Sequence, residues 1–76
     1  MNLNNNFEIP IETQKRIERN SYLLATDKYM LPDYPITEEQ RQEIIIYRQQ
    51  LRDMPQQDPD QPENWTLPEK PEWLNL

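Results

Sequence analysis

Few side chains in this sequence could carry out chemistry. Histidine and cysteine are both absent from the 76 residues, so the usual near-neutral acid-base group and the thiolate zinc ligands are missing. Glycine is absent too, which excludes the glycine-rich loops that cradle phosphates. Paired carboxylates remain at Glu38 and Glu39 and at Glu69 and Glu72, and we expect them to face solvent, since paired-acid catalysis requires a cleft. The sequence predicts no enzyme activity, no metal or other cofactor and no small-molecule substrate.

The net charge and the hydropathy of the chain limit the kinds of partner that it is expected to bind. The net charge is −6, so neither a nucleic-acid footprint nor a basic membrane-binding face is expected. No apolar run is longer than four residues, as at 44–47, which is too short to span a bilayer. The Asn-rich N-terminus lacks the pattern of a secretory signal. Only 34% of the residues are hydrophobic, a small core for a lone chain. We therefore expect a partner protein to supply additional contact surface.

The first predicted helix covers residues 11–26. Pro10 suits the start of a helix, where its missing N–H costs nothing, and no helix breaker follows until residue 26. Ile17 and Leu24 fall on one face, with Leu23 beside them. We expect this thin apolar face to be the buried side of the helix.

The second predicted helix covers residues 38–54 and carries the clearest local signal. Thr37 and Gln40 have the spacing of a capping box, and Pro55 ends the helix. Its expected apolar face consists of Ile44, Tyr47, Leu51 and Met54, widened by Ile45. The arginines of this helix are expected to lie mostly on the opposite side, namely Arg41, Arg48 and Arg52.

Proline-rich segments complete a small all-α fold. A turn rich in proline joins the two helices, and Asp27 in it is expected to accept a local backbone hydrogen bond. Residues 56–76 form an extended, proline- and tryptophan-rich C-terminal arm that can wrap the helices or bind another protein. The expected organisation is a flexible polar N-terminal arm (1–10), in which Phe7 and Ile9 could dock on a partner, a helical hairpin-like module (11–55) and the extended segment (56–76).

The order of motifs resembles the phage tail assembly chaperone family, the small domain of tail-fibre assembly proteins. The matching residues lie between Arg19 and Pro71 and comprise Arg19, Leu23-Leu24, Thr26-Asp27, Leu31-Pro32-Asp33, Pro35, Thr37, Tyr47-Arg48-Gln49, Leu51-Arg52-Asp53, Pro55, Trp65, Pro68 and Pro71. Two tryptophans usual in the family are replaced here by Lys28, which Tyr29 follows, and by Ile44. In the closing element Trp65 does not directly precede a proline, and acidic residues 58–60 replace an aromatic insert.

This resemblance implies a protein that helps to fold, trimerise or attach a tail fibre or a related tail or baseplate protein in the host cytoplasm, without catalysis or a cofactor. The alternative is a minor virion protein of the tail or baseplate that stays in the particle and staples larger subunits. The polar N-terminal arm and the tryptophan-rich tail favour that alternative. A third alternative is an anti-host protein that binds one host enzyme.

Seven residues are candidates for partner binding, drawn from the turn, the second helix and the tail: Tyr29, Tyr47, Arg48, Arg52, Trp65, Trp73 and Leu74. An internal role is the competing interpretation for several of them. Tyr47 and Leu51 would then pack on Leu23, Leu24 and the tail, and Arg52 would pair with Asp27 or Asp53. Trp65 would cover the helix pair, whereas Trp73, beyond the family match, is the better candidate for contact with another chain.

Overall fold

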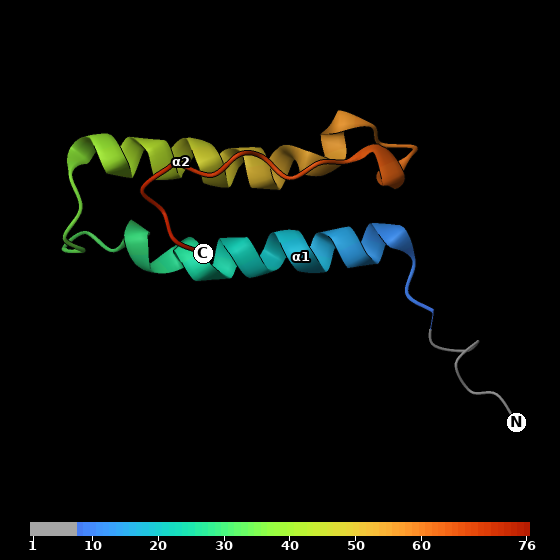
Figure 1. Ribbon diagram of the computed structural model, residues 1–76, viewed down its shortest axis with the longest axis horizontal. Coiled ribbons are helices and arrows are strands. Elements are labelled where there is room, and N and C mark those ends of the chain that lie inside the picture. Colours follow the sequence, from blue (N-terminus) through green and yellow to red (C-terminus); the bar gives the residue numbers. More distant parts are fainter. Residues whose placement is uncertain (1–7) are drawn as a thin grey trace, which may run out of the picture.

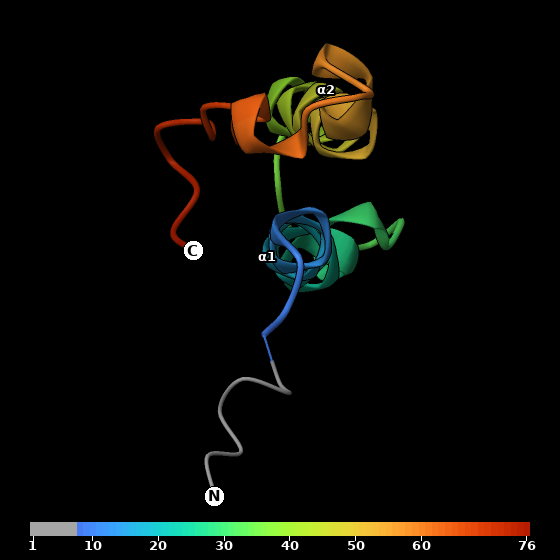
Figure 2. The same ribbon diagram turned by 90° about the vertical axis from the view of Figure 1, so that its right-hand side faces the viewer.

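The computed structural model describes residues 8–76, so the suggested docking residue Phe7 lies outside the described part. Helix α1 (Ile11–Thr26) and helix α2 (Glu38–Asp53) lie side by side and run in opposite directions (Figures 1 and 2). No strand occurs between residues 8 and 76. The predicted small all-α fold with two helices is confirmed, and the observed boundaries agree with the predicted ones to within one residue.

The connection between the helices begins with one extra turn. Asp27–Met30 form a 3₁₀ helix directly after α1. Leu31 then adopts an extended conformation, with φ −66° and ψ 136°, as expected for a residue before proline. The chain can therefore reverse without a residue of positive φ, and residues 8–76 contain none.

Helix α2 begins at the predicted capping box. The Gln40 backbone N–H donates to the Thr37 hydroxyl oxygen at 3.0 Å, and the Thr37 backbone N–H donates to Oε1 of Gln40 at 2.9 Å. Glu38 and Glu39 occupy the first turn, where the helix dipole favours negative charge. Local sequence alone therefore fixes the start of this helix.

Replacing Thr37 with alanine is expected to lower the free energy of unfolding by about 1 kcal/mol, because one N–H at the helix start loses its acceptor. Urea denaturation followed by circular dichroism measures this change. The serine variant keeps the hydroxyl and should stay close to wild type. Equal destabilisation by both substitutions would contradict a capping role.

The core is built on the predicted face of α2. Ile44, Tyr47 and Leu51 are buried, and they form one cluster with Leu74 from the C-terminal segment. The following Met54 is buried as well, so the apolar face predicted for this helix is confirmed. Ile45 does not widen it, because its side chain remains 42% exposed.

The face predicted for α1 is wrong. Ile17 and Leu24 are 56% and 74% exposed, respectively. Leu23, expected beside them, does pack on the core, and it does so together with Tyr22 and the buried Thr26. The physical reason is that polar contacts of this helix, described below, fix its rotation, and a count of apolar residues does not register them.

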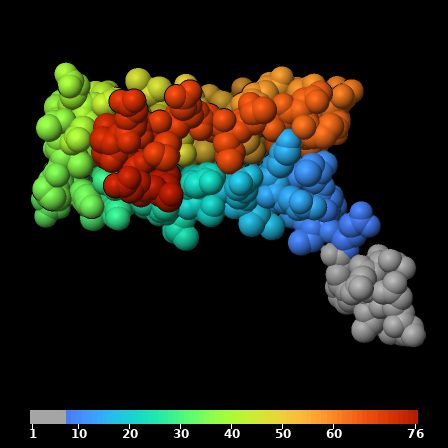
Figure 3. Space-filling model, in the orientation of Figure 1, coloured from blue at the N-terminus to red at the C-terminus, as the bar shows by residue number. Residues whose placement is uncertain are grey.

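The C-terminal segment runs back along α2 and ends over α1 (Figure 1). It covers one face of the helix pair (Figure 3). Two one-turn 3₁₀ helices, Met54–Gln57 and Pro62–Asn64, interrupt the extended path, and each has proline in its first turn, where proline is tolerated. Leu74 is completely buried, so the segment wraps its own helices.

Candidate interaction surface

Arg48 joins the two helices through its guanidinium group. Nη1 donates hydrogen bonds to the Leu23 carbonyl oxygen and to the Thr26 hydroxyl, both at 2.7 Å, and Nη2 lies 2.8 Å from Oδ1 of Asp27. The Thr26 hydroxyl in turn donates to the Tyr22 carbonyl oxygen at 2.8 Å. These acceptors lie at the C-terminal end of α1, where the helix dipole favours a cation. Arg48 therefore closes the end of α1 from the neighbouring helix.

This arrangement corrects three sequence-based expectations. Arg48 does not lie on the solvent side of α2, because only 9% of it is exposed. Asp27 binds Arg48 rather than the local backbone. The suggested pairing of Arg52 with Asp27 or Asp53 is not observed; Arg52 is exposed, and Asp53 accepts a hydrogen bond from Gln49 at 3.0 Å.

Arg41 also binds backbone carbonyl oxygens, those of residues that follow α1. Its Nη1 and Nη2 donate to the carbonyl oxygens of Tyr29 at 3.3 Å and Leu31 at 3.2 Å. Arg41 and Arg48 are seven residues apart, so both lie on one face of α2. Two arginines of α2 thus bind the carbonyl oxygens at which α1 and its 3₁₀ extension end.

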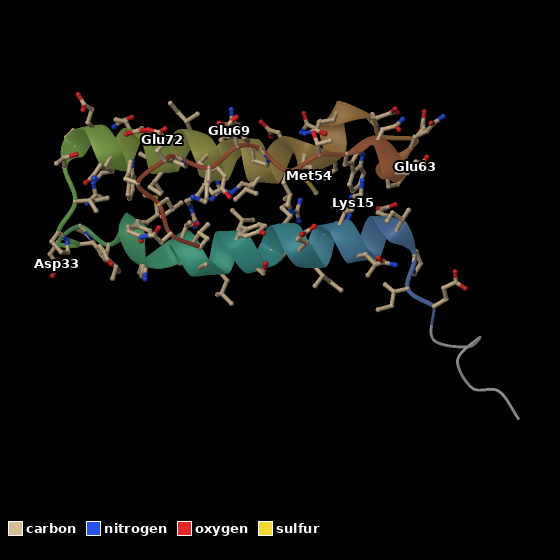
Figure 4. All side chains as sticks on the ribbon, viewed as in Figure 1. Lys15, Asp33, Met54, Glu63, Glu69 and Glu72 are labelled. Atoms are coloured by element: carbon tan, nitrogen blue, oxygen red, sulfur yellow. The ribbon has the colours of Figure 1, made fainter. Side chains whose placement is uncertain are left out.

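Trp65 fastens the C-terminal segment at the other end of the helix pair. Its indole N–H donates to the Asp58 carbonyl oxygen at 2.8 Å, and the Arg16 guanidinium lies 5.3 Å from the ring centroid. Nζ of Lys15 donates to the carbonyl oxygens of Glu63 at 2.9 Å and Trp65 at 2.7 Å (Figure 4). The cations of α1 therefore hold the tail and set the rotation of this helix.

An amide side chain holds the start of the tail. Nε2 of Gln57 donates to the Thr66 carbonyl oxygen at 2.9 Å, and Oε1 of Gln57 accepts from the Thr66 backbone N–H at 2.8 Å. This pair of bonds occupies both backbone polar groups of Thr66, as a neighbouring strand would. Gln57 thereby ties the beginning of the C-terminal segment to a residue nine positions further along the chain.

Aromatic rings meet near the connection between the helices. The Tyr29 ring makes edge contacts with Tyr34, at a centroid distance of 4.8 Å, and with Trp73, at 5.9 Å. The indole N–H of Trp73 donates to Oε1 of Glu43 at 3.2 Å. Nζ of Lys28 lies 5.4 Å from the Tyr29 ring centroid. Tyr29 therefore binds the end of the tail to the connection.

A groove of about 350 Å³ separates α2 from the C-terminal segment. One wall comes from α2 and the other from residues 69–72, and the lining residues are Glu43, Ile46, Tyr47, Gln50, Glu69, Lys70, Pro71 and Glu72. Ile46 is 57% exposed. Figure 4 shows Glu69 and Glu72 on the segment where it crosses α2. The groove thus combines an exposed apolar side chain with several carboxylates.

Tyr47 lies between this groove and a smaller hollow of about 140 Å³, and it lines both. Burial raises the pKa of the Tyr47 phenol above its ordinary value of 10.0, and the nearby Tyr22 raises it further. The folded protein therefore favours the neutral phenol of Tyr47 over the phenolate.

The stability of the protein is expected to fall as pH rises above about 10. The unfolded chain releases the Tyr47 proton at the ordinary pKa, whereas the folded chain retains it to higher pH, so the stabilisation is complete below that pKa and is lost above it. Denaturation midpoints measured from neutral to strongly alkaline pH reveal this loss. The Tyr47→Phe variant should show a weaker decline, and an unchanged decline would assign the effect to other groups.

The predicted partner-binding residues are not equally accessible. Tyr47, Arg48, Trp65 and Leu74 are buried within the chain, Tyr29 and Trp73 are half-buried, and Arg52 is exposed. Tyr47 and Leu51 lie in the core cluster on which Leu23 packs, as the competing internal interpretation expected, although Leu24 points to solvent. Contact of any of these residues with a partner stays a prediction.

The groove residues Ile46, Glu69 and Glu72 were not identified as binding residues from the sequence. The two walls of the groove are about twenty residues apart in the sequence, so the spacing of residue types cannot predict that they meet. The one signal in the sequence was the apolar run 44–47, because a single face of a helix cannot bury all four of its side chains. Ile46 is one of those left exposed. Glu69 and Glu72 are exposed, as expected, and they also border the groove.

The described residues were also searched for metal-binding clusters and for membrane-spanning helices. Residues 8–76 contain no group of three or more acidic, histidine or cysteine side chains that could hold a metal ion. None of the helices in this part of the chain has the length and apolar character needed to cross a bilayer.

Comparison with known proteins gives one result. No curated protein and no solved structure matches the chain. The model of the phage tail assembly chaperone protein family matches residues 12–72. The match includes most of α1, all of α2 and the C-terminal segment as far as Glu72, so it contains all the groove residues. Because this match covers most of the 76 residues, the chain belongs to the phage tail assembly chaperone protein family.

Proposed function

We propose that this protein is a non-catalytic assembly chaperone or adaptor that binds a phage tail-fibre, tail or baseplate protein. Family membership over residues 12–72 is the observation that carries the proposal. Its place of action is the host cytoplasm during phage assembly. The partner is a protein, in keeping with a net charge of −6 that suits neither nucleic acid nor an anionic membrane.

The accessible surface supports binding rather than catalysis. Protein interfaces combine apolar side chains with a polar rim, and the groove beside α2 has this composition around Ile46. The aromatic side chains Tyr47 and Trp65 already serve the fold. Contact surface for a partner therefore comes from groups that the chain itself leaves exposed.

Co-purification tests the proposal directly. The tagged full-length protein is co-expressed with each tail-fibre, tail and baseplate protein of the same phage, and a capsid protein serves as the control. We expect a stable complex with at least one tail component and none with the capsid protein. The absence of any such complex, with every candidate partner folded, would refute the proposed function.

Mass spectrometry of purified particles separates a chaperone from a retained virion component. A chaperone leaves the assembled tail, so we expect the protein to be missing from finished particles. An amount equimolar with a structural subunit would instead support the virion alternative. One argument for that alternative is weakened, because Trp65 and Leu74 of the tail are buried against the protein's own helices.

A further inference from the structure

We propose that the groove between α2 and the C-terminal segment binds a segment of the partner that carries a cationic side chain next to an apolar one. This inference rests on the proposed function and specifies the chemistry of the partner. The argument depends on the charge balance of the groove, its apolar surface and its size.

The charge of the groove is unbalanced. Three carboxylates, those of Glu43, Glu69 and Glu72, face one ammonium group. That ammonium group, on Lys70, donates to the Leu74 carbonyl oxygen and so is already engaged in holding the tail. Glu43 accepts a hydrogen bond from Trp73.

Glu69 and Glu72 have no such engagement. Neither side chain takes part in a hydrogen bond or ion pair with any residue between 8 and 76. The groove therefore presents negative charge that the described part of the chain does not neutralise, and a cationic ligand complements it.

The apolar part of the groove adds a second requirement. Ile46 is more than half exposed, and Pro71 lies across the groove from it. Arginine and lysine can lay their aliphatic stems on such a surface while their charged ends reach carboxylates. Arginine can also donate two parallel hydrogen bonds to one carboxylate. A cationic residue beside an apolar one therefore matches both parts of the groove.

The size of the groove selects a short segment as the ligand. A volume of about 350 Å³ lies at the lower end of the range for ligand pockets, which suits a few side chains of an extended segment. A second copy of this chain is a poorer match, because two chains of net charge −6 repel each other. The occupant is therefore a basic, partly apolar stretch of the tail protein.

Synthetic peptides tiling the tail-fibre, tail and baseplate proteins of the same phage provide the test. Binding to the full-length protein is followed by fluorescence anisotropy at low salt. We expect the bound peptides to contain Lys or Arg adjacent to an apolar residue. The double variant Glu69→Lys with Glu72→Lys should weaken their binding about tenfold, through lost attraction and added repulsion.

A matched control changes the net charge equally but leaves the groove intact. Glu8→Lys combined with Glu18→Lys alters two exposed carboxylates that do not line the groove, and its affinity should stay within about twofold of wild type at moderate ionic strength. Raising the salt from about 0.05 M to about 0.5 M should weaken binding to the wild-type protein more than to the groove variant. The salt dependence of the wild-type protein needs no variant, so it tests the role of charge even if the groove variant were to fold poorly.

The outcomes separate this inference from the proposed function. If a tail protein co-purifies with wild type but the groove variant binds it and the peptides equally well, only the groove proposal fails. Preferential binding of acidic peptides, or equal weakening by the control variant, would also overturn it, as would self-association of the wild type through Glu69 and Glu72. If no tail component binds the wild-type protein, both proposals fail.

Discussion

Replacing Leu51 with alanine is expected to lower the free energy of unfolding by about 2–5 kcal/mol, the largest effect among the substitutions considered. Leu51 is completely buried and belongs to the cluster of Ile44, Tyr47 and Leu74. Its truncation removes apolar contacts and leaves a cavity where both helices and the tail meet. For a chain of 76 residues, such a loss is a large part of the total stability, so helicity at room temperature should fall as well.

Urea denaturation followed by circular dichroism measures this effect, with Leu24→Ala as the control. The control makes the same chemical change at a side chain that is 74% exposed, and it should alter the free energy of unfolding by no more than about 0.5 kcal/mol. Equal effects of the two substitutions would show that the two leucines are not distinguished by burial and would refute the described packing.

Arg48→Met should produce the second-largest effect, a loss of about 2–3 kcal/mol. Methionine has a similar length but cannot donate, so the Leu23 carbonyl oxygen and the Thr26 hydroxyl lose a charged hydrogen-bond donor. The ion pair with Asp27 adds little, since the Asp27 side chain is 58% exposed and water screens the pair. Hydrogen bonding at the end of α1, rather than charge pairing, is therefore the source of the expected loss.

Two matched substitutions test that assignment. Asp27→Asn keeps the shape of the side chain and removes only the charge, and it should cost less than about 1 kcal/mol. Arg52→Met makes the same change as Arg48→Met at an exposed position of the same helix and should be nearly neutral. If Asp27→Asn proved as destabilising as Arg48→Met, the ion pair would be the dominant interaction.

The residues that carry the family resemblance mostly build the fold. Thr26 and Asp27 bind Arg48, Tyr47 lies in the core, and Trp65 anchors the tail. The groove residues Ile46, Glu69 and Glu72 lie within the family match but are not among the motif residues that carry the resemblance. There the structure leaves apolar surface and charge available.

Local sequence determined the helices of this protein. The capping box at Thr37 and Gln40 and the stop at Pro55 need only neighbouring residues, and the apolar face of α2 follows from its periodicity. Proline at position 10 likewise marks the start of α1. Each of these features depends on interactions within one or two turns of chain, which is why the spacing of residue types was sufficient to predict them.

Tertiary structure alone decided which way α1 faces, where Arg48 lies and how the C-terminal segment packs. Each depends on contacts between residues far apart in the chain, such as Arg48 with Leu23 and Lys15 with Trp65. Apolar periodicity cannot register them, because the groups that rotate α1 are cations and backbone carbonyl oxygens. The groove arises in the same way, since its walls meet only after the tail has folded back along α2.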